Sequence, residues 1–235
     1  QYALGGEMLI LDRSTSYIGV LIDDIVTKGT NEPYRIMTSR VEYRLTLRQD
    51  NADIRLTPLG YKFGLISEER MERLRRKIGD TEAETERLKT VKLSPSPLAD
   101  DIMDRAGTAR LTSGVSLYDL LKRPQITYTM LVDADPGRPS LSREVITQVE
   151  LNIKYEDYIK KQQAQIDRFR RLEDKKIPEN FDYLGMKNLR LEARQKLDKI
   201  RPENLGQAGR ISGVSPADVN VLLIELTKNR NPIVR

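Results

Sequence analysis

Three arginines recur at a fixed interval of four residues: Arg40, Arg44 and Arg48. A step of four returns to nearly the same face of a helix, and on a strand even-numbered positions share one face. In either structure the three guanidinium groups are expected to project together. A planar guanidinium donates two hydrogen bonds to paired oxygens, so such a row suits phosphate or carboxylate. The alternative is a solvated face paired with neighbouring acidic residues, which are Glu42, Asp50 and Asp53.

The composition removes several kinds of chemistry. None of the 235 residues is cysteine or histidine, which excludes disulfides, cysteine-bound zinc and Ser-His-Asp catalysis within this chain. The chain also lacks a glycine-rich phosphate loop of the GxGxxG or GxxxxGK type. Asp23 and Asp24 form an adjacent acidic pair, but on the strand expected there they would point to opposite faces. An enzyme complete in itself is therefore disfavoured.

The charge balance permits a nucleic-acid partner without requiring one. Lysine and arginine number 40 against 35 acidic residues, a net charge of +5. No apolar run approaches about 18 residues, so no membrane-spanning segment is expected, and no signal peptide is visible. The chain opens on Gln1 and not on methionine, so it reads as part of a longer protein.

The segment that carries the arginine row is expected to start with a short buried strand at 17–22, which is apolar and partly β-branched. Ser39 and Glu42 fit a capping box that would begin a helix at Arg40. Val41 begins an alternation of apolar and polar residues that instead favours a half-buried strand. Helix is the preferred interpretation, and the shared face of the arginines is expected in both cases.

From Thr57 onward the sequence predicts helices. Thr57 is expected to cap a helix with Pro58 at its first position, and Ser67 to cap the next one. A short helix is expected around 117–121, and a long one over 142–173, a stretch free of glycine and proline. The end of the long helix is basic and carries tyrosines, which suits RNA; lysines that complement the helix dipole are the alternative reading.

The tail resembles a helix-turn-helix but is not expected to read DNA. Gly209, Gly213 and Val219 match the small, turn and buried positions of that motif. The last helix, which opens at Pro216, offers Asp218 and many apolar residues where a groove-reading helix would offer Arg, Lys, Asn or Gln. Such a helix is expected to be buried in a bundle or against another protein.

Four stretches together resemble one family of enzymes. The run SYIGVLIDDIVTKGTNEPYRIMTSRVEYRLTLRQDNADIRLT resembles the signature near the end of the flavin domain of the MnmG/GidA family. KYEDYIKKQQAQI, IPENFDY and RPENLGQAGRISGVSPADVNVLLIEL are similar to three later signatures of the same family. Two positions depart from the usual pattern, because Gly209 replaces a more common serine and Val41 a more common alanine.

The resemblance implies a mainly α fold in three parts. Residues 1–56 are expected to be the tail end of the FAD-binding domain, a small α/β remnant. Residues 57–140 are expected to form a helical subdomain. Residues 141–235 are expected to form a C-terminal helical subdomain, a bundle that docks a partner.

The resemblance also implies an activity for the parent protein, modification of the wobble uridine of tRNA at C5 with a carboxymethylaminomethyl group. FAD is the implied cofactor, with NADH and folate as co-substrates. The implied partners are tRNA, the GTPase MnmE and a second copy in a homodimer, in the cytoplasm and without membrane or DNA. The dinucleotide fingerprint and catalytic cysteines are expected upstream, so this chain alone is expected to be inactive, with no catalytic residue and no metal site.

Individual roles follow from the matched motifs. The residues expected to hold tRNA are Lys28, Arg35, Arg40, Arg44, Arg48, Arg55, Lys160, Lys161, Arg168 and Arg171. The residues expected to dock the GTPase are Gln207, Arg210, Ile211, Ser212 and Val214. The alternative is a pure protein-interaction module, in which the arginines are structural and tRNA is held elsewhere.

Overall fold

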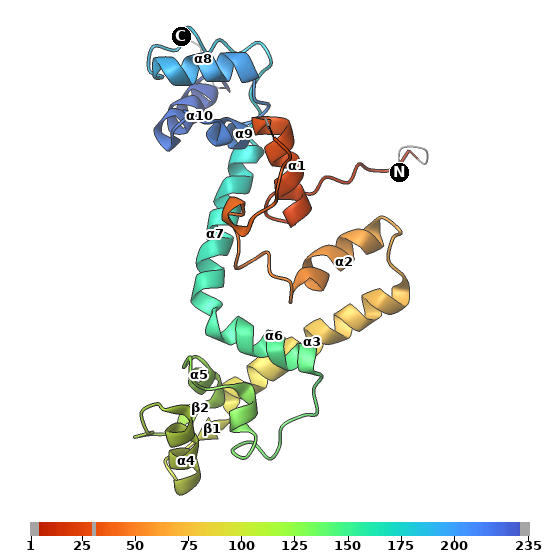
Figure 1. The fold of residues 1–235 in the computed structure, drawn as a ribbon, viewed down its shortest axis with the longest axis vertical. Helices are drawn as coiled ribbons and strands as arrows, with labels where there is room; N and C mark the ends of the chain where they lie inside the picture. Colours follow the sequence, from red (N-terminus) through yellow and green to blue (C-terminus); the bar gives the residue numbers. More distant parts are fainter. Residues whose placement is uncertain (1–4, 30–31, 231–235) are drawn as a thin grey trace. The chain divides into compact units, whose positions relative to one another are not determined.

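The computed structural model describes residues 5–29 and 32–230, and α-helix dominates this part of the chain (Figure 1). Its α-helices are α1 (Tyr17–Lys28), α2 (Ala52–Lys62), α3 (Glu68–Thr90), α4 (Pro97–Ala106), α5 (Leu117–Leu121), α6 (Arg143–Lys154), α7 (Glu156–Glu173), α8 (Leu191–Ile200), α9 (Leu205–Arg210) and α10 (Pro216–Arg230). Two 3₁₀ helices, η2 (Thr38–Arg40) and η3 (Tyr128–Leu131), and two short strands, β1 (Lys92–Leu93) and β2 (Val115–Ser116), complete it. The mainly helical fold is confirmed.

The described residues divide into two compact units. Unit 1 contains the residues up to 10 and residues 44–161, and unit 2 contains residues 11–43 together with those from 162 onward. These limits differ from the expected domain boundaries after residues 56 and 140. The helix α7 begins in unit 1 and ends in unit 2.

Unit 1 is built around the long helix α3, which contacts α2, α5 and α6. Ser67 caps α3 as expected, since its hydroxyl accepts from the Arg70 amide at 3.4 Å. The core joins buried side chains of α3, α4, α5 and α6, among them Leu88, Ile102, Leu120 and Val149. Burying each such side chain contributes about 1.5–3 kcal/mol. β1 and β2 form an antiparallel pair in which Leu93 lies opposite Val115.

The C-terminal part of unit 2 is a small helical bundle, as expected. Leu197 of α8, Ala208 of α9 and Leu222 of α10 are buried in one core, together with Tyr183 from the connecting segment. Gly213 takes a φ of 94° in the turn between α9 and α10, a conformation that suits glycine. α10 contributes Val219 and Leu222 to this core and leaves Ile224 exposed.

The expected strand at 17–22 is wrong, because these residues begin α1. Ser16 caps the helix by accepting from the Gly19 amide at 3.0 Å. A short apolar run fits a buried strand and a buried helix equally well, and here the apolar residues continue beyond the acidic pair as Ile25 and Val26. Within the described part of residues 1–56 the structure shows helices and turns and no strand.

The arginine-row segment is neither the expected helix nor the alternative strand. Only Thr38–Arg40 forms a 3₁₀ turn, and residues 41–50 form bends and turns up to the start of α2. Val41, Tyr43 and Leu47 are buried, each anchoring an irregular backbone. A common face for Arg40, Arg44 and Arg48 required a regular backbone, so that inference does not hold.

Two further helix limits differ from expectation. Pro58 lies inside α2, which begins at Ala52, so Thr57 is not its cap. The helix expected over 142–173 is interrupted at Tyr155, whose φ of −106° and ψ of 12° separate α6 from α7. Ser142 caps α6, since its hydroxyl accepts from the Val145 amide at 3.3 Å.

Candidate functional site

A cluster of ion pairs around the buried Arg13 holds the segment before the arginine row. Arg13 is 2% exposed, and its Nη1 donates to Asp24 Oδ1 at 2.7 Å and to Asp23 Oδ2 at 3.0 Å. Its Nη2 donates to Glu42 Oε1 at 2.7 Å and to the Arg40 carbonyl at 3.2 Å. We call Arg13, Asp23, Asp24 and Glu42 the Arg13 cluster. Both aspartates therefore face one arginine from a helix, and the expected strand geometry with opposed side chains is wrong.

The charge of Arg13 is secured by its partners. Burial opposes the charged form, but the hydrogen bonds and negative charges of Glu42 and Asp24 outweigh it and raise the pKa of Arg13. A buried cation of this kind is stable only while its carboxylates stay in place. The Arg13 cluster thus fixes α1 against the residues around η2.

Arg210 connects the same cluster to the C-terminal helices of unit 2. Its Nη2 donates to Asp23 Oδ1 and its Nη1 to Glu173 Oε1, both at 2.8 Å. The guanidinium lies 5.1 Å from the ring centroid of Phe169, which itself packs edge-on against Tyr43 at 6.3 Å. The Arg210 side chain is only 9% exposed. Its observed contacts join α1, α7 and α9 within unit 2.

The members of the arginine row have different surroundings. Arg40 is exposed, and its guanidinium lies 4.8 Å above the Tyr34 ring. Arg44 is exposed and has no acidic partner among the described residues. Arg48 is 16% exposed, pairs with Asp50 at 3.1 Å and donates to the Leu45 carbonyl at 2.5 Å. Arg40 belongs to unit 2 and the other two to unit 1, so the row is divided between units.

The other residues expected to hold tRNA near the row also differ. Arg35 is exposed in the irregular segment before η2 and has no acidic partner among the described residues. Arg55 on α2 donates to Asn51 Oδ1 at 3.0 Å and to the Arg48 carbonyl at 2.9 Å. Lys28 is the last residue of α1, and its side chain lies outside the described part of the structure.

The basic residues of α7 are mostly open to solvent. Lys160 pairs with Glu156 at 2.7 Å. Lys161, Arg168 and Arg171 are exposed, and no acidic group of the described residues pairs with them. Arg168 and Arg171 are three residues apart, so they share one face of the helix.

The expected docking residues of the tail include core positions. Ile211 and Val214 are buried among the bundle helices, whereas Ser212 is exposed. The Gln207 side-chain oxygen accepts from the backbone N–H of Glu203 at 2.9 Å. The backbone N–H of Gln207 donates to Asn204 Oδ1 at 2.8 Å, so both groups stabilise the start of α9.

Asp218 has a structural role that spacing did not reveal. It is buried and accepts from the Ser215 amide at 2.8 Å and from its hydroxyl at 2.7 Å, which holds the first turn of α10. Hydrogen bonds from Arg190 and Ser215 keep the pKa of Asp218 well below its usual range despite burial. The carboxylate is turned into the protein and pairs with Arg190, and the expectation that this helix does not read DNA stays a prediction.

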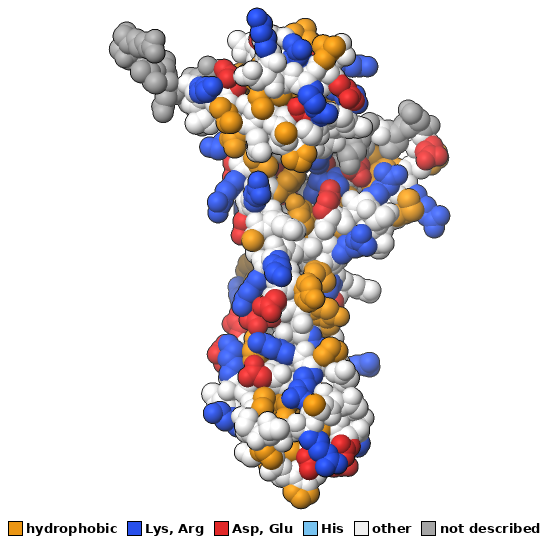
Figure 2. Space-filling model, turned by 90° about the vertical axis from the view of Figure 1, so that its left-hand side faces the viewer, with side chains coloured by type: hydrophobic (Ala, Val, Ile, Leu, Met, Phe, Trp, Pro, Cys, Tyr) orange, Lys and Arg blue, Asp and Glu red, His pale blue; other side chains and the backbone are white. Residues whose placement is uncertain are grey.

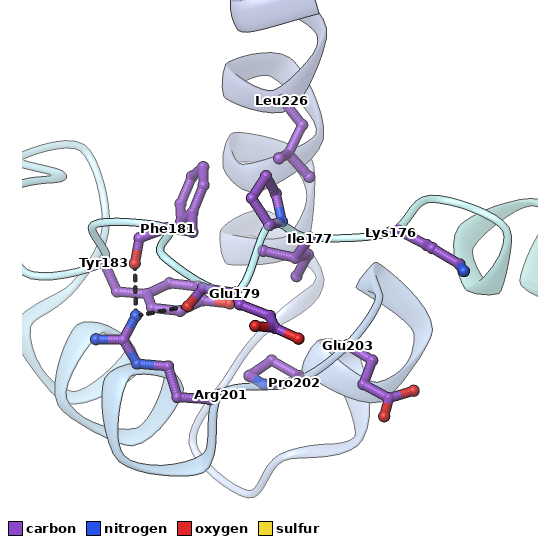
Figure 3. A pocket seen from close by; sticks show the side chains of 10 residues that line it. Lys176, Ile177, Glu179, Phe181, Tyr183, Arg201, Pro202, Glu203 and Leu226 are labelled. Carbon is purple, nitrogen blue, oxygen red and sulfur yellow. Dashed lines mark hydrogen bonds between the residues drawn. The ribbon is translucent and has the colours of Figure 1, made fainter.

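A pocket of about 700 Å³ lies within the bundle of unit 2 (Figure 3). Figure 3 shows Phe181 and Tyr183 on one side and Leu226 of α10 on another, with Arg201 donating to the carbonyls of Phe181 at 2.8 Å and Glu179 at 3.4 Å. Arg201 adopts a left-handed backbone with φ of 53°. Nothing in the sequence pattern indicated this pocket.

Basic, acidic and apolar side chains are interspersed over the face drawn in Figure 2. No group of three or more acidic, cysteine or histidine side chains in the described residues is arranged to hold a metal ion. These residues also provide no strand that leads through a glycine-rich turn into a helix, the feature that binds a dinucleotide pyrophosphate. The residues present therefore do not by themselves form an FAD site of that type. Among the described helices, none has the length and apolar character needed to cross a bilayer.

Two family models match consecutive parts of the chain. Residues 68–163 match the model described as the tRNA modifying enzyme MnmG/GidA C-terminal helical domain. Residues 165–233 match the model described as the C-terminal helical bundle of the same enzymes.

Similar proteins extend this match to the N-terminal residues. The tRNA uridine 5-carboxymethylaminomethyl modification enzyme MnmG of Caldicellulosiruptor saccharolyticus is 58% identical over 96% of this chain and 36% of its own length. The enzyme of the same name from Geobacillus kaustophilus is 51% identical over 97% of this chain and 36% of its own length. A crystal structure of Aquifex aeolicus GidA has a TM-score of 0.76 and 37% identity, covering 96% of this chain and 35% of that one.

The fold and these matches place the chain among the helical C-terminal regions that the two family models describe. The chain belongs to the MnmG/GidA family. It spans about a third of the length of the curated relatives that it matches. The resemblance expected from the sequence is thereby confirmed.

Proposed function

We propose that this chain is part of an enzyme that adds a carboxymethylaminomethyl group to C5 of the wobble uridine, and that it binds tRNA and a partner GTPase. The relatives are named for that modification. The observation that carries the tRNA role is a set of exposed cations without acidic partners among the described residues. These cations are Arg35, Arg44, Lys161, Arg168 and Arg171, accompanied by Arg40 on Tyr34.

Exposed cations without partners suit phosphate because binding releases counterions and breaks no internal contact. Arg48, Arg55 and Lys160 stay in the proposal with a smaller share, since each already binds a protein group. Lys28 stays in the proposal from its sequence motif alone.

The test is a filter-binding titration of this chain with tRNA across salt concentrations. Arg44→Ala is expected to lower the slope of log affinity against log salt by about 0.7–0.9, the effect of one lost phosphate contact. The matched control is Arg110→Ala, since Arg110 is exposed but paired with Asp104 and Asp100. Absence of salt-dependent binding, or equal slopes for both variants, would contradict the tRNA role.

For the GTPase role we assign MnmE to the bundle of unit 2. Gln207 and Arg210 make internal hydrogen bonds beneath this surface, and the buried Ile211 and Val214 pack in the core below it. Ser212 is the exposed member of the expected set. Leu191 of α8 and Ile224 of α10 add exposed apolar groups on the same bundle. In this proposal these two exposed apolar side chains contact the partner.

A pull-down with purified MnmE tests this assignment. Ile224→Asp is expected to reduce capture at least about tenfold, because a charge would be buried against the partner. Leu98→Asp is the matched control, as Leu98 is an exposed leucine of unit 1. Undiminished capture by Ile224→Asp would count against docking through α10.

The remaining assignments concern the longer protein. They are FAD as redox cofactor, NADH and folate as co-substrates, a homodimer, a cytoplasmic location, and residues 1–56 as the end of the flavin domain. Flavin absorbance in a purified full-length relative with these C-terminal residues, and its loss when only residues 1–235 are produced, would support the assignment of FAD and of its site. Flavin bound by residues 1–235 alone would contradict the assignment of its site to upstream residues.

A second candidate function is a protein-interaction module without RNA contact. It is favoured by the internal contacts of Arg48, Arg55, Lys160 and Arg210, each of which binds a protein group. The same salt titration separates the two, because this alternative predicts no tRNA binding by the chain at any salt concentration.

A further inference from the structure

A shallow pocket in unit 2 surrounds the stacked pair of Tyr34 and Arg40. It measures about 690 Å³ and is lined by Gly29, Glu32, Pro33, Tyr34, Arg35, Met37 and Arg40. The Arg40 guanidinium covers the Tyr34 ring at 4.8 Å, close enough for a cation–π contact. Arg40 is itself exposed, so its guanidinium group is accessible from solvent.

Hydrogen bonds to the Arg13 cluster hold Tyr34 and Arg40 in place. The Tyr34 hydroxyl donates to Asp24 Oδ2 at 2.7 Å, and the other oxygen of Asp24 accepts from the buried Arg13. Burial and the bond to Asp24 raise the pKa of Tyr34, which keeps the phenol protonated as a donor. The Arg40 carbonyl also accepts from Arg13 Nη2 at 3.2 Å. Both members of the stack are therefore held by the Arg13 cluster.

We propose that the Tyr34–Arg40 pair is a stacking platform for one unpaired RNA nucleobase, with Arg35 holding the adjoining phosphate. This inference rests on the proposed tRNA role and assigns its chemistry. Unpaired bases of RNA are recognised by stacking on aromatic rings or arginine planes, and the backbone by cations beside them. Arg35 lines the same pocket, is exposed, and has no acidic partner among the described residues.

Charge and planarity can be separated by two matched substitutions. Arg40→Lys keeps the charge and removes the plane, whereas Arg35→Lys keeps the charge that a phosphate contact needs. The probe is a stem-loop RNA carrying 2-aminopurine in its loop, titrated against the whole chain. Arg40→Lys is expected to weaken binding about tenfold with an unchanged salt slope, and Arg35→Lys by less than about threefold.

Tyr34 provides the second readout. Tyr34→Phe keeps the ring and is expected to retain the quenching of 2-aminopurine, while Tyr34→Ala is expected to abolish it and to weaken binding about tenfold. Thermal unfolding of each variant confirms that unit 2 is folded, and Arg40→Lys keeps the test informative if Tyr34→Ala unfolds.

The outcomes separate this inference from the function on which it rests. If the unaltered chain shows no salt-dependent RNA binding, the tRNA role fails and the platform fails with it. If the chain binds RNA but Arg40→Lys and Arg35→Lys have equal effects, or quenching survives in a folded Tyr34→Ala variant, only the stacking platform is overturned.

Discussion

Arg13 and Arg35 belong to the same unit and the same residue type, yet their surroundings are opposite. Arg13 is enclosed by Asp23, Asp24 and Glu42, whereas Arg35 is exposed without an acidic partner among the described residues. A buried arginine stabilises the fold only through its carboxylates, while an exposed one is available to an external anion. The role of an arginine here is therefore set by the residues that the fold places beside it.

The largest expected effect is that of Arg13→Ala on stability. The substitution removes the guanidinium that pairs with the buried Asp24 and with Asp23, which keeps its ion pair with Arg210. Breaking a buried pair from one side costs about 3–5 kcal/mol. Urea unfolding of this variant should show the loss in unit 2. A cost below about 1 kcal/mol would contradict the claim that Arg13, unlike Arg35, stabilises the fold.

Arg210→Ala is expected to have the next largest effect. It removes two charged hydrogen bonds at 2.8 Å and the contact with Phe169, a cost of about 1.5–3 kcal/mol. Because Arg13 and Arg210 share Asp23, the double variant should depart from the sum of the single ones. Urea unfolding of all three variants measures this coupling, and strict additivity would contradict a shared network.

Glu156 of unit 1 offers an intermediate case, since its side chain is 29% exposed. Hydrogen bonds from Lys160 and Tyr118 lower its pKa from 4.5 to about 2. The folded pKa lies below the unfolded one, so the stabilisation is present above pH 4.5 and is lost as pH falls toward 2. Glu156→Gln should therefore lose less stability across this window than the unaltered chain, by under about 1 kcal/mol.

Urea unfolding above pH 4.5 and near pH 2 measures that difference. Glu72→Gln is the matched control, because Glu72 is more exposed and pairs with Arg75 at 3.3 Å. If both variants lost the same unfolding free energy at low pH, the hydrogen bonds of Glu156 would not contribute to the pH dependence of stability.

The smallest expected stability effect is that of Arg35→Ala. Its removal should change the unfolding free energy by no more than about 0.5 kcal/mol, since no acidic partner among the described residues is lost. The same variant should lower the salt slope of tRNA binding by about 0.7–0.9. A large loss of stability with an unchanged salt slope would show that Arg35 stabilises the fold and does not bind tRNA.

Much of the helical framework was predictable because its signals are local. Ser67 precedes its helix as an ordinary cap, and Pro216 opens α10 as expected. The apolar run at 17–22 was ambiguous, since its length fits a strand or a helix. The interruption at Tyr155 carries no glycine or proline signal.

The site was less predictable than the fold because its determinants are distant in sequence. Spacing located the arginines, and the tail signature pointed to Arg210, but neither revealed that Arg210 binds Asp23. No motif or spacing pointed to Arg13, although its partners Asp23 and Asp24 stand out as an adjacent acidic pair. A pair of adjacent aspartates inside an apolar run was the available signal that a counter-charge must be near.

The bond between Arg210 and Asp23 also has a consequence for the order of folding, because its partners lie 187 residues apart. During synthesis Asp23 emerges 187 residues before Arg210, so unit 2 cannot complete its ion pairs until α9 has left the ribosome. Unit 1, whose described core lies between Leu88 and Ile153, can form before that. The core of unit 1 is thus expected to form before the ion pairs of unit 2 are complete.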